Sequence, residues 1–515
     1  MRSRIFVHFI AVGVLCSPML ASTSLADQTA PVIVESPPTD QGPAFVPGTR
    51  LVDDLPTDYI EEEFFISGKA DLYNYAHNPP LGPTDIVTIQ EEVSYKTRII
   101  VRRPAKANKF NGTVVIEWWN STAGFDTAPA WDPSAEYFAN SGTVYVGVTN
   151  STTSLGFLVG GCRLLGLLPP ACGTRYSTLS LPANGLAWDV MGQIANLLKS
   201  DDVSNPLPVD YAVERVLHAG ESQQAGSVIT YASGFHLDGL NDGYFVQSGI
   251  NSRPINFGPA CGAAGSPPFP NCTPRLSFPA SRVRTDLPVP VYQTVTQTDF
   301  EGLGFSVFGR QVDTPTFRYY EIAGAAHNTV HEGIEIIPAG VVGPDPILLT
   351  DLCLEQLNTV ADGPVFASYV LNALWERMQE QLINGDEPPA GVLLDTTLDT
   401  TTSPPEFKLV RDDLGNVEGG VRLPSMEAPT ATYVSTATAN PFLPPFLASF
   451  ANLACRLSGA VLPFDEYTLS ALYPDHGTYV SQVVESANEL KSQGLMLQQD
   501  AVTVKTAAAA SDIGQ

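Results

Sequence analysis

Basic residues are scarce in this 515-residue chain. It carries 27 Lys and Arg residues against 54 Asp and Glu residues, which gives a formal net charge of −27. A surface of this sign repels phosphate groups, so we expect neither a nucleic-acid partner nor binding to anionic membranes. The composition instead indicates a solvated acidic surface.

Long apolar runs are absent beyond the N-terminus. No later segment offers the roughly 18 uninterrupted apolar residues of a transmembrane helix, so no membrane insertion is expected. At the N-terminus, Arg2 and Arg4 precede an apolar stretch over residues 5–15, and small residues lead up to Ala26. This pattern predicts a signal peptide over 1–26, cleaved near Ala26, and therefore a secreted or periplasmic protein.

Cysteine is sparse but even in number once the predicted signal peptide is removed. Of the seven cysteines, Cys16 lies in that peptide. Six remaining cysteines in an exported chain indicate disulfides, although buried free thiols are the alternative and the connectivity is open. Pairing of neighbours in sequence would give three bonds, Cys162–Cys172, Cys261–Cys272 and Cys353–Cys455.

One serine stands between a predicted strand and a predicted helix. Residues 220–224 read Gly-Glu-Ser-Gln-Gln and follow the apolar segment 213–219. A serine on a sharp strand-to-helix turn is the nucleophile elbow of α/β-hydrolases, in which the turn presents the hydroxyl at the edge of the sheet. The usual second glycine is missing, because Gln224 occupies its position. Ser222 is the candidate nucleophile, and the argument for it depends on the residues that follow.

Two further residues come after Ser222 in the order that this fold uses. Asp299 ends the predicted strand 289–298, and His327 follows the predicted strand 317–323. All three residues therefore lie just past the carboxyl end of a strand, where the active sites of open α/β sheets lie. A histidine with a pKa of about 6.5 is the base that a serine hydroxyl needs, and a carboxylate orients it. The alternatives are a helix-capping role for Asp299 and a packing role for His327.

Acyl transfer also needs donors for the developing oxyanion. We expect one from the N–H of Gln223 and the other from Asn120 or Ser121, which follow the predicted strand 112–119, because no His-Gly-Gly run is present. No cofactor or metal is expected. His327, His331 and Glu332 lack the His-Glu-x-x-His spacing of a zinc hydrolase helix.

Strand-like and helix-like segments alternate along the chain, which predicts a mostly parallel sheet flanked by helices. A lead-in is expected over 27–85 and an α/β-hydrolase domain over 86–515. The eight expected strands are an antiparallel pair within 86–105 and single strands near 112–119, 143–149, 213–219, 243–248, 289–298 and 317–323. Helices are expected near 184–199, 364–384 and 478–494. Cap-like insertions are expected near 151–183 and 251–285, with a C-terminal extension over 330–515.

Several segments together resemble the exported bacterial family of the alpha/beta hydrolase domain-10 type. They are residues 115–118 with Asn120, the elbow, and 320–327, and later 419–424 and 472–476 with Tyr479 and Val480. The resemblance implies that the C-terminal third belongs to the same domain, with Ser222 as nucleophile and His327 as base. Gln297 departs from the acid-rich turn that the family often shows, which leaves Asp299 as the acid and Glu301 as the fallback.

These observations predict a secreted serine carboxylic ester hydrolase that acts on a small-molecule ester through an acyl-enzyme. The resemblance implies esterase-type hydrolysis without a particular substrate. Two other functions stay open, namely an acyltransferase on the same triad and a non-catalytic hydrolase-like binding protein. The incomplete elbow is the feature that favours the binding protein.

Overall fold

The structure is a computed structural model. It describes residues 26–48, 50–163, 171–257, 276–304, 307–327, 335–337, 345–358 and 367–515. Several predicted features lie outside these ranges: nearly all of the signal peptide, Cys261 and Cys272 with most of the second insertion, and His331 and Glu332. Within the described ranges, no helix combines the length and the apolar character that crossing a membrane requires.

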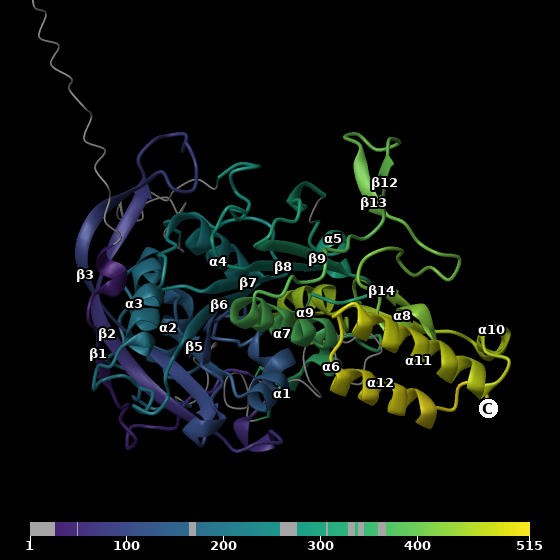
Figure 1. Ribbon diagram of the computed structural model, residues 1–515, viewed down its shortest axis with the longest axis horizontal. Coiled ribbons are helices and arrows are strands. Elements are labelled where there is room, and N and C mark those ends of the chain that lie inside the picture. The colour runs from purple at the N-terminus through teal and green to yellow at the C-terminus, as the bar shows by residue number, and fades with distance from the viewer. Residues whose placement is uncertain are drawn as a thin grey trace, which may run out of the picture.

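A mixed sheet organises the chain (Figure 1). Its strand order is β1-β2-β3-β5-β4-β6-β7-β8-β9. The pairs from β1 to β5 are antiparallel, whereas β5, β4, β6, β7, β8 and β9 run parallel. The strands are β1 (Ile33–Glu35), β2 (Tyr59–Tyr75), β3 (Ile86–Pro104), β4 (Thr113–Trp118), β5 (Val144–Val148), β6 (Arg215–Glu221), β7 (Gly243–Gln247), β8 (Val291–Thr296) and β9 (Phe317–Ile322).

Both faces of this sheet are covered, so nearly every residue of its parallel strands is buried. Successive side chains of a strand point to opposite faces. In β4, Val114 and Ile116 pack in one buried cluster with α3 (Ala187–Lys199) and α4 (Gln223–Gly234). Val115 packs in the other cluster with α1 (Trp131–Ser141) and α7 (Ser368–Asn384). The core therefore consists of two layers, one on each side of the sheet.

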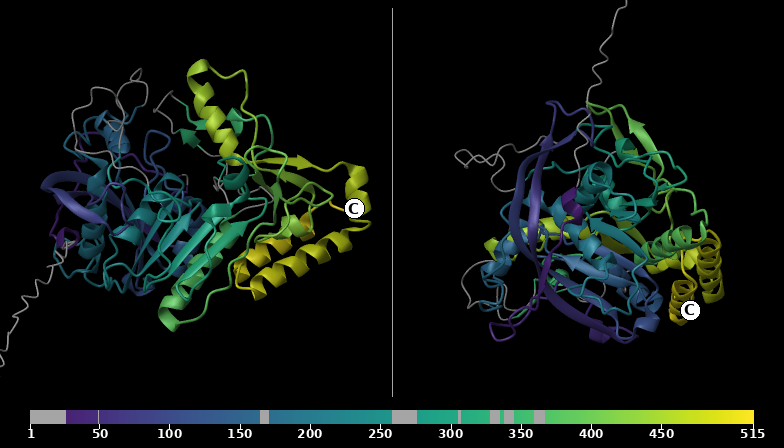
Figure 2. Two further views of the ribbon diagram at one scale, coloured as in Figure 1. Left: turned by 90° about the horizontal axis from the view of Figure 1, so that it is seen from above. Right: turned by 60° about the vertical axis from the view of Figure 1, so that its left-hand side comes forward.

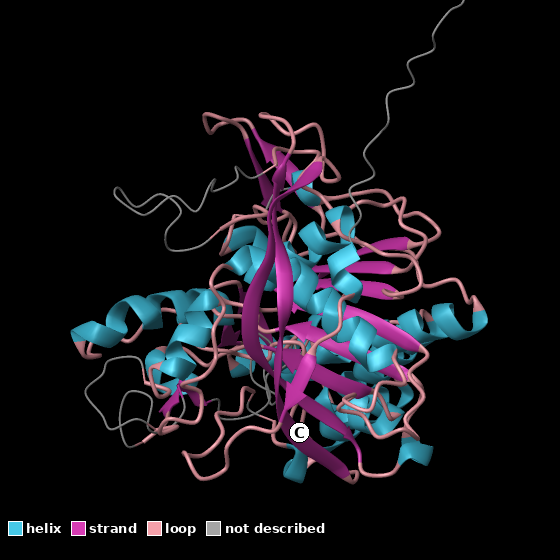
Figure 3. Ribbon diagram, turned by 90° about the vertical axis from the view of Figure 1, so that its left-hand side faces the viewer, coloured by secondary structure: helices cyan, strands magenta, loops and turns pink. Residues whose placement is uncertain are grey.

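The strands predicted from 112 to 323 are confirmed, but the pair predicted within 86–105 is wrong. That segment is one strand, β3, and its partner β2 lies in the predicted lead-in, as does β1. Figure 3 turns this edge of the molecule toward the viewer and shows two long adjacent strands. The sheet thus has nine strands in the part of the chain that the structure describes, one more than predicted.

The first insertion contains α2 (Thr152–Val159) and the Cys162–Cys172 disulfide. The extension contains a second disulfide, Cys353–Cys455, so two of the three predicted bonds are confirmed. Helices near 184–199, 364–384 and 478–494 are also confirmed as α3, α7 and α11. Helix α11 spans His476–Ser492. The remaining helices are α5 (Gln297–Glu301), α6 (Leu349–Leu352), α8 (Pro424–Glu427), α9 (Pro445–Ser458), α10 (Glu466–Leu472) and α12 (Gln498–Ala510). Short 3-10 helices lie at Ala26–Thr29, Val52–Asp54, Ala107–Lys109, Asn184–Leu186 and Val307–Gly309.

Three two-stranded sheets complete the extension. They pair β10 (Glu335–Ile337) with β11 (Ile347–Leu348), β12 (Thr396–Asp399) with β13 (Glu406–Leu409), and β14 (Ala431–Val434) with β15 (Ala460–Pro463). Helices α11 and α12 lie side by side at the end of the molecule opposite β2 and β3 (Figures 1 and 2).

Candidate active site

Ser222 occupies a strained turn between β6 and α4. Its φ is 54° and its ψ is −114°, a conformation that costs a non-glycine residue on the order of 1–3 kcal/mol. The turn is held by a hydrogen bond from the N–H of Ser222 to the carbonyl of Gln247, with a length of 2.9 Å. A Cβ at Gly220 would lie 2.6 Å from the carbonyl oxygen of Gln224, so glycine is required there. These are the local features of a nucleophile elbow.

The missing second glycine of the motif is compensated locally. The side chain of Gln224 is buried and is directed toward the loop after β5, where its Nε2 donates to Oδ1 of Asn150 at 2.9 Å. The close approach of helix α4 instead uses Gly249, which follows β7. A Cβ at that position would lie 2.4 Å from the Cβ of Ala225. The chain therefore keeps the first glycine of the motif at Gly220, while Gly249 after β7 makes room for helix α4.

Asp299 lies completely buried in the first turn of α5, directly after β8. Its Oδ2 accepts the N–H of Thr296 at 2.7 Å, and the Thr296 hydroxyl accepts the N–H of Asp299 in return. Its Oδ1 pairs with Nδ1 of His327. The carboxylate therefore caps α5 with one oxygen and contacts the imidazole with the other, and its catalytic role stays a prediction.

Residues from distant parts of the chain hold the loop that carries His327. The N–H of Gly324 donates to Oε1 of Gln297 at 2.9 Å, and Nδ2 of Asn358 donates to the carbonyl of Gly324. The N–H of Ala323 donates to the carbonyl of Val421 at 3.0 Å. Asn358 and Val421 belong to the C-terminal extension, so the extension forms part of the support of this site.

His327 is buried between two carboxylates. Its Nδ1 contacts Asp299, and its Nε2 lies 3.0 Å from Oε1 of Glu221, the residue before Ser222. Burial by itself lowers the pKa of His327, but the charges of Glu221 and Asp299 and the hydrogen bond to Asp299 outweigh it and raise the pKa to about 10. In this arrangement the two carboxylates favour the protonated form of the imidazole.

Asn120 and Ser121, the residues predicted after β4 to supply an oxyanion donor, make different contacts in the structure. The N–H of Asn120 donates to the carbonyl of Thr127 at 3.1 Å, and its side-chain amide donates to Oε2 of Glu221 at 3.1 Å. Its backbone donor is therefore engaged within its own loop. Ser121 lies beside the residue after the nucleophile, since its hydroxyl donates to Oε1 of Gln223 at 2.8 Å.

The structure brings Ser222, Glu221, Asp299 and His327 to one place but not Glu301. The carboxylate of Glu301 accepts from Nη2 of Arg411 at 2.7 and 2.8 Å and contacts the hydroxyl of Ser435. Asn358 is a supporting residue that the sequence reasoning missed. No local pattern marks it, because its role depends on the folding of the extension against β9.

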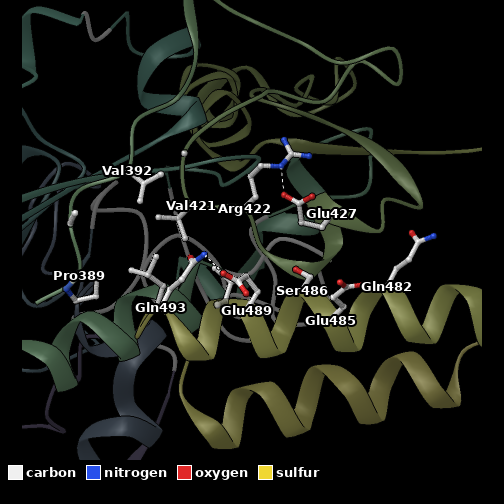
Figure 4. Close-up of a pocket in the computed structure, with 14 residues that line it drawn as sticks. Pro389, Val392, Val421, Arg422, Glu427, Gln482, Glu485, Ser486, Glu489 and Gln493 are labelled. Carbon is white, nitrogen blue, oxygen red and sulfur yellow. Dashed lines mark hydrogen bonds and ion pairs between the residues drawn. The ribbon is translucent and has the colours of Figure 1, made fainter.

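Two cavities bear on the site. A small one of about 20 Å³ lies beside Glu221 and His327 and is lined by neutral side chains of β7, β8, β9 and α7. A larger groove of about 800 Å³ lies between α11 and the segments 389–392 and 420–427, and contains none of the predicted site residues (Figure 4). Among the described residues, no cluster of three or more His, Cys, Asp or Glu side chains is arranged to hold a metal ion.

Comparison with known proteins gives a family match and distant structural neighbours. The alpha/beta hydrolase domain family matches over residues 34–506. No curated protein matches. Similar solved structures include the glucuronoyl esterase from Solibacter usitatus, at 12% identity, covering 58% of this chain and 85% of that one with a TM-score of 0.24. A glucuronoyl esterase from Teredinibacter turnerae is 14% identical, and the match covers 44% of this chain and 50% of that one with a TM-score of 0.21. The rice cell wall degrading esterase LipA from Xanthomonas oryzae is 10% identical, and the match covers 37% of this chain and 42% of that one with a TM-score of 0.22.

Proposed function

The chain belongs to the alpha/beta hydrolase domain family, and from this premise we propose that it is a serine carboxylic ester hydrolase with Ser222, His327 and Asp299 as its triad. One observation carries the proposal. The strained serine of the elbow directly follows a residue that contacts His327, and the other nitrogen of the same imidazole contacts a buried carboxylate. In this proposal, a nucleophile, a base and an orienting acid lie at the carboxyl ends of β6, β9 and β8.

The proposed reaction proceeds in two halves. Neutral His327 takes the proton of the Ser222 hydroxyl on Nε2 while Oγ bonds to the ester carbonyl carbon. The tetrahedral intermediate then collapses as the carbon–oxygen bond to the alcohol breaks and Nε2 returns the proton to the leaving alcohol. Water attacks the acyl-enzyme by the same route, which releases the carboxylic acid and restores the Ser222 hydroxyl.

Asp299 supports this proton transfer through its position. Because both of its oxygens are engaged, one by the N–H of Thr296 and one by Nδ1 of His327, the carboxylate has one orientation. It holds the proton of the imidazole on Nδ1 and directs Nε2 toward β6. For the oxyanion, we propose the N–H of Gln223, at the first turn of α4, together with the loop at Ser121.

The compartment is also part of the proposal. Disulfides form and persist in oxidising surroundings, and two of them tie this chain together. With the predicted signal peptide, they support a secreted or periplasmic enzyme that acts on a small-molecule ester. An assay over different esters has to identify the acyl and alcohol groups of the substrate.

The test is hydrolysis of p-nitrophenyl esters of increasing acyl length by the wild-type protein and by Ser222→Ala. We expect the variant to lose the activity by about a thousandfold or more. Ser227→Ala, which removes a buried hydroxyl from the same helix, is the matched control and should retain it. Equal activity of Ser222→Ala and wild type would contradict the assignment of the nucleophile.

An organophosphonate probe and an acceptor alcohol separate the alternatives. Labelling at Ser222 without ester hydrolysis would indicate a competent site with a different substrate, and transfer of the acyl group to an added alcohol would indicate an acyltransferase. A folded protein that neither labels nor hydrolyses would instead support the hydrolase-like binding protein.

A further inference from the structure

We propose that Glu221 is a positioning residue that holds Nε2 of His327 in the free protein and thereby sets the pH at which Ser222 can be activated. The inference rests on the proposed triad function and deepens it. It concerns the step before ester cleavage, in which Nε2 of His327 has to leave Glu221 and contact the hydroxyl of Ser222.

The geometry around Nε2 carries the inference. Oε1 of Glu221 lies 3.0 Å from Nε2, the nitrogen that must accept the proton of Ser222. The second nitrogen, Nδ1, is occupied by Asp299. An imidazole with a carboxylate at each nitrogen is stabilised in its charged form, and a charged imidazole has no lone pair with which to act as a base.

Glu221 has few alternatives to this contact. Its side chain is only 8% exposed, and within the described part of the chain its Oε1 has no hydrogen-bond partner. A buried carboxylate is stable only when it is paired or hydrogen-bonded. The charge of the imidazolium therefore compensates the charge of Glu221, and the contact is an ion pair rather than a well-aligned hydrogen bond.

Asn120 fixes the carboxylate in this position. Its Nδ2 lies 3.1 Å from Oε2 of Glu221 and 3.3 Å from the carbonyl oxygen of the same residue. The loop after β4 thus holds Glu221 from one side while His327 holds it from the other. Ser222 directly follows Glu221 in the chain, so both side chains start from the same turn at the end of β6.

Apart from Glu221 and His327 themselves, the described residues that line the small cavity beside the pair carry no charge. The small cavity beside Glu221 and His327 is lined by Gln247 and Ser248 from the end of β7, Thr294 and Thr296 from β8, Ile322 from β9, Pro129, and Ala367 and Leu371 at the start of α7. Among the described residues, the charges that act most strongly on His327 are those of Glu221 and Asp299. Among the described residues, Glu221 and Asp299 are therefore the charged groups that oppose the effect of burial on the pKa of His327.

The experiment titrates His327 directly. The ¹³Cε1–¹H signals of the histidines are followed by NMR against pH in the full chain, and His327→Gln identifies the signal of His327. In Glu221→Gln, we expect the pKa of His327 to fall by about 1–3 units relative to wild type, because a carboxylate in contact with the ring has been neutralised. Glu221→Asp, which withdraws the carboxylate by one methylene, should lie between the two.

Asp238→Asn is the matched control. Oδ1 of Asp238 lies 3.0 Å from Nε2 of His236, the same distance as in the proposed pair, but the Asp238 side chain is 84% exposed. This substitution should leave the pKa of His327 unchanged. An unchanged pKa of His327 in Glu221→Gln would overturn the inference, and Glu221→Asp decides in the same way if the glutamine variant does not fold.

Activity provides the second readout and separates this inference from the proposed function. If the protein hydrolyses esters, the acidic limb of kcat/KM against pH should move down in Glu221→Gln together with the NMR pKa. A limb that stays in place while the pKa falls would overturn the role of Glu221 in activation. If no ester is hydrolysed and no phosphonate labels Ser222, the proposed function fails, while the titration still decides whether Glu221 holds His327.

Discussion

His218 shows at the scale of one residue how burial determines protonation. It lies in β6, four residues before Ser222, and is fully buried. Its Nδ1 accepts from the indole N–H of Trp118 at 3.4 Å, and its Nε2 lies 2.8 Å from Oδ1 of Asn241. Because an amide oxygen only accepts, Nε2 carries the proton and the ring is neutral. Burial lowers the pKa of His218 to about 3.

This histidine should make the protein sensitive to acid. Its pKa is about 3 when folded and about 6.5 when unfolded, so the unfolded chain binds a proton that the folded one refuses. The stability from this site is therefore complete above pH 6.5 and is lost as the pH falls toward 3, by up to about 1.4 kcal/mol per pH unit. Urea unfolding between pH 7.5 and 4.5 should show a smaller loss of stability in His218→Gln than in wild type.

His77 provides the control for that measurement. Its side chain is 58% exposed, so His77→Gln controls for the loss of a histidine that is not buried. An equal loss of stability toward acid in wild type and in His218→Gln would show that other groups govern the acid response.

Single residues also show which features of the candidate site could be predicted from the sequence and which could not. The positions of Ser222, Asp299 and His327 could be predicted because the chain order and the strand ends are visible in the sequence. The partner of Nε2 could not, since it depends on where the loop after β4 directs Asn120. That loop uses the N–H of Asn120 for a bridge to Thr127 and its amide for Glu221, two contacts that no local pattern encodes.

At the scale of elements, the turn between β8 and α5 is joined to the His327 loop through Gln297. The Gln297 side chain is fully buried. Its Oε1 accepts from Gly324, and its Nε2 donates to the hydroxyl of Ser435 at 3.1 Å and to the carbonyl of Tyr433 at 3.3 Å. One side chain thus links the element of Asp299, the loop of His327 and strand β14 of the extension.

Gln297→Ala should reduce catalysis more than substrate binding. The change leaves the N–H of Gly324 and the hydroxyl of Ser435 without this partner, which costs on the order of 1–3 kcal/mol of stability. A His327 loop displaced by a fraction of an ångström should lower kcat by about 10–100-fold with little change in KM. Steady-state kinetics on the best p-nitrophenyl ester would measure both.

Gln311→Ala is the matched control, because Gln311 also donates to a backbone carbonyl, that of Val283 at 3.2 Å, away from the His327 loop. It should leave kcat unchanged. A rise in KM alone in Gln297→Ala would contradict a role in positioning the loop.

Strand β2 explains why one element escaped prediction. Its residues Glu61, Glu62 and Glu63 give the segment the polar character of a loop. In the sheet they pair with arginines, as Glu61 does with Arg102 at 2.8 Å and Glu62 with Arg103 at 2.7 Å. When the segment is considered without its tertiary partners, a run of charged residues disfavours a strand. The arginines that neutralise Glu61 and Glu62 lie 41 residues later in the chain.

At the scale of the whole molecule, the extension is continuous with the hydrolase core. Trp375 of α7, Tyr433 of β14 and Ala501 of α12 share one buried cluster with Val115 and Leu217 of the central strands. The family match over residues 34–506 agrees with this packing. The resemblance seen in the sequence implied a single domain, which stays a prediction, and the shared buried cluster is what such a domain would need.

The two disulfides should differ in what they contribute to the stability of this domain. Cys353–Cys455 connects residues 102 positions apart, whereas Cys162–Cys172 connects residues 10 apart. A cross-link removes more entropy from the unfolded chain when its loop is longer, and in the chain-entropy relation the difference between these loops is about 2 kcal/mol. All four cysteines are buried, so replacement by alanine leaves comparable packing defects.

We therefore expect the double variant Cys353→Ala/Cys455→Ala to lose about 2 kcal/mol more unfolding free energy than Cys162→Ala/Cys172→Ala. Each pair serves as the matched control for the other in urea denaturation at fixed pH. The long-range bond also connects α6 to α9, whose side chains form a small separate buried cluster, so its loss should unfold these helices first. An equal loss in the two variants would mean that folded-state packing, rather than the unfolded chain, determines what these bonds contribute.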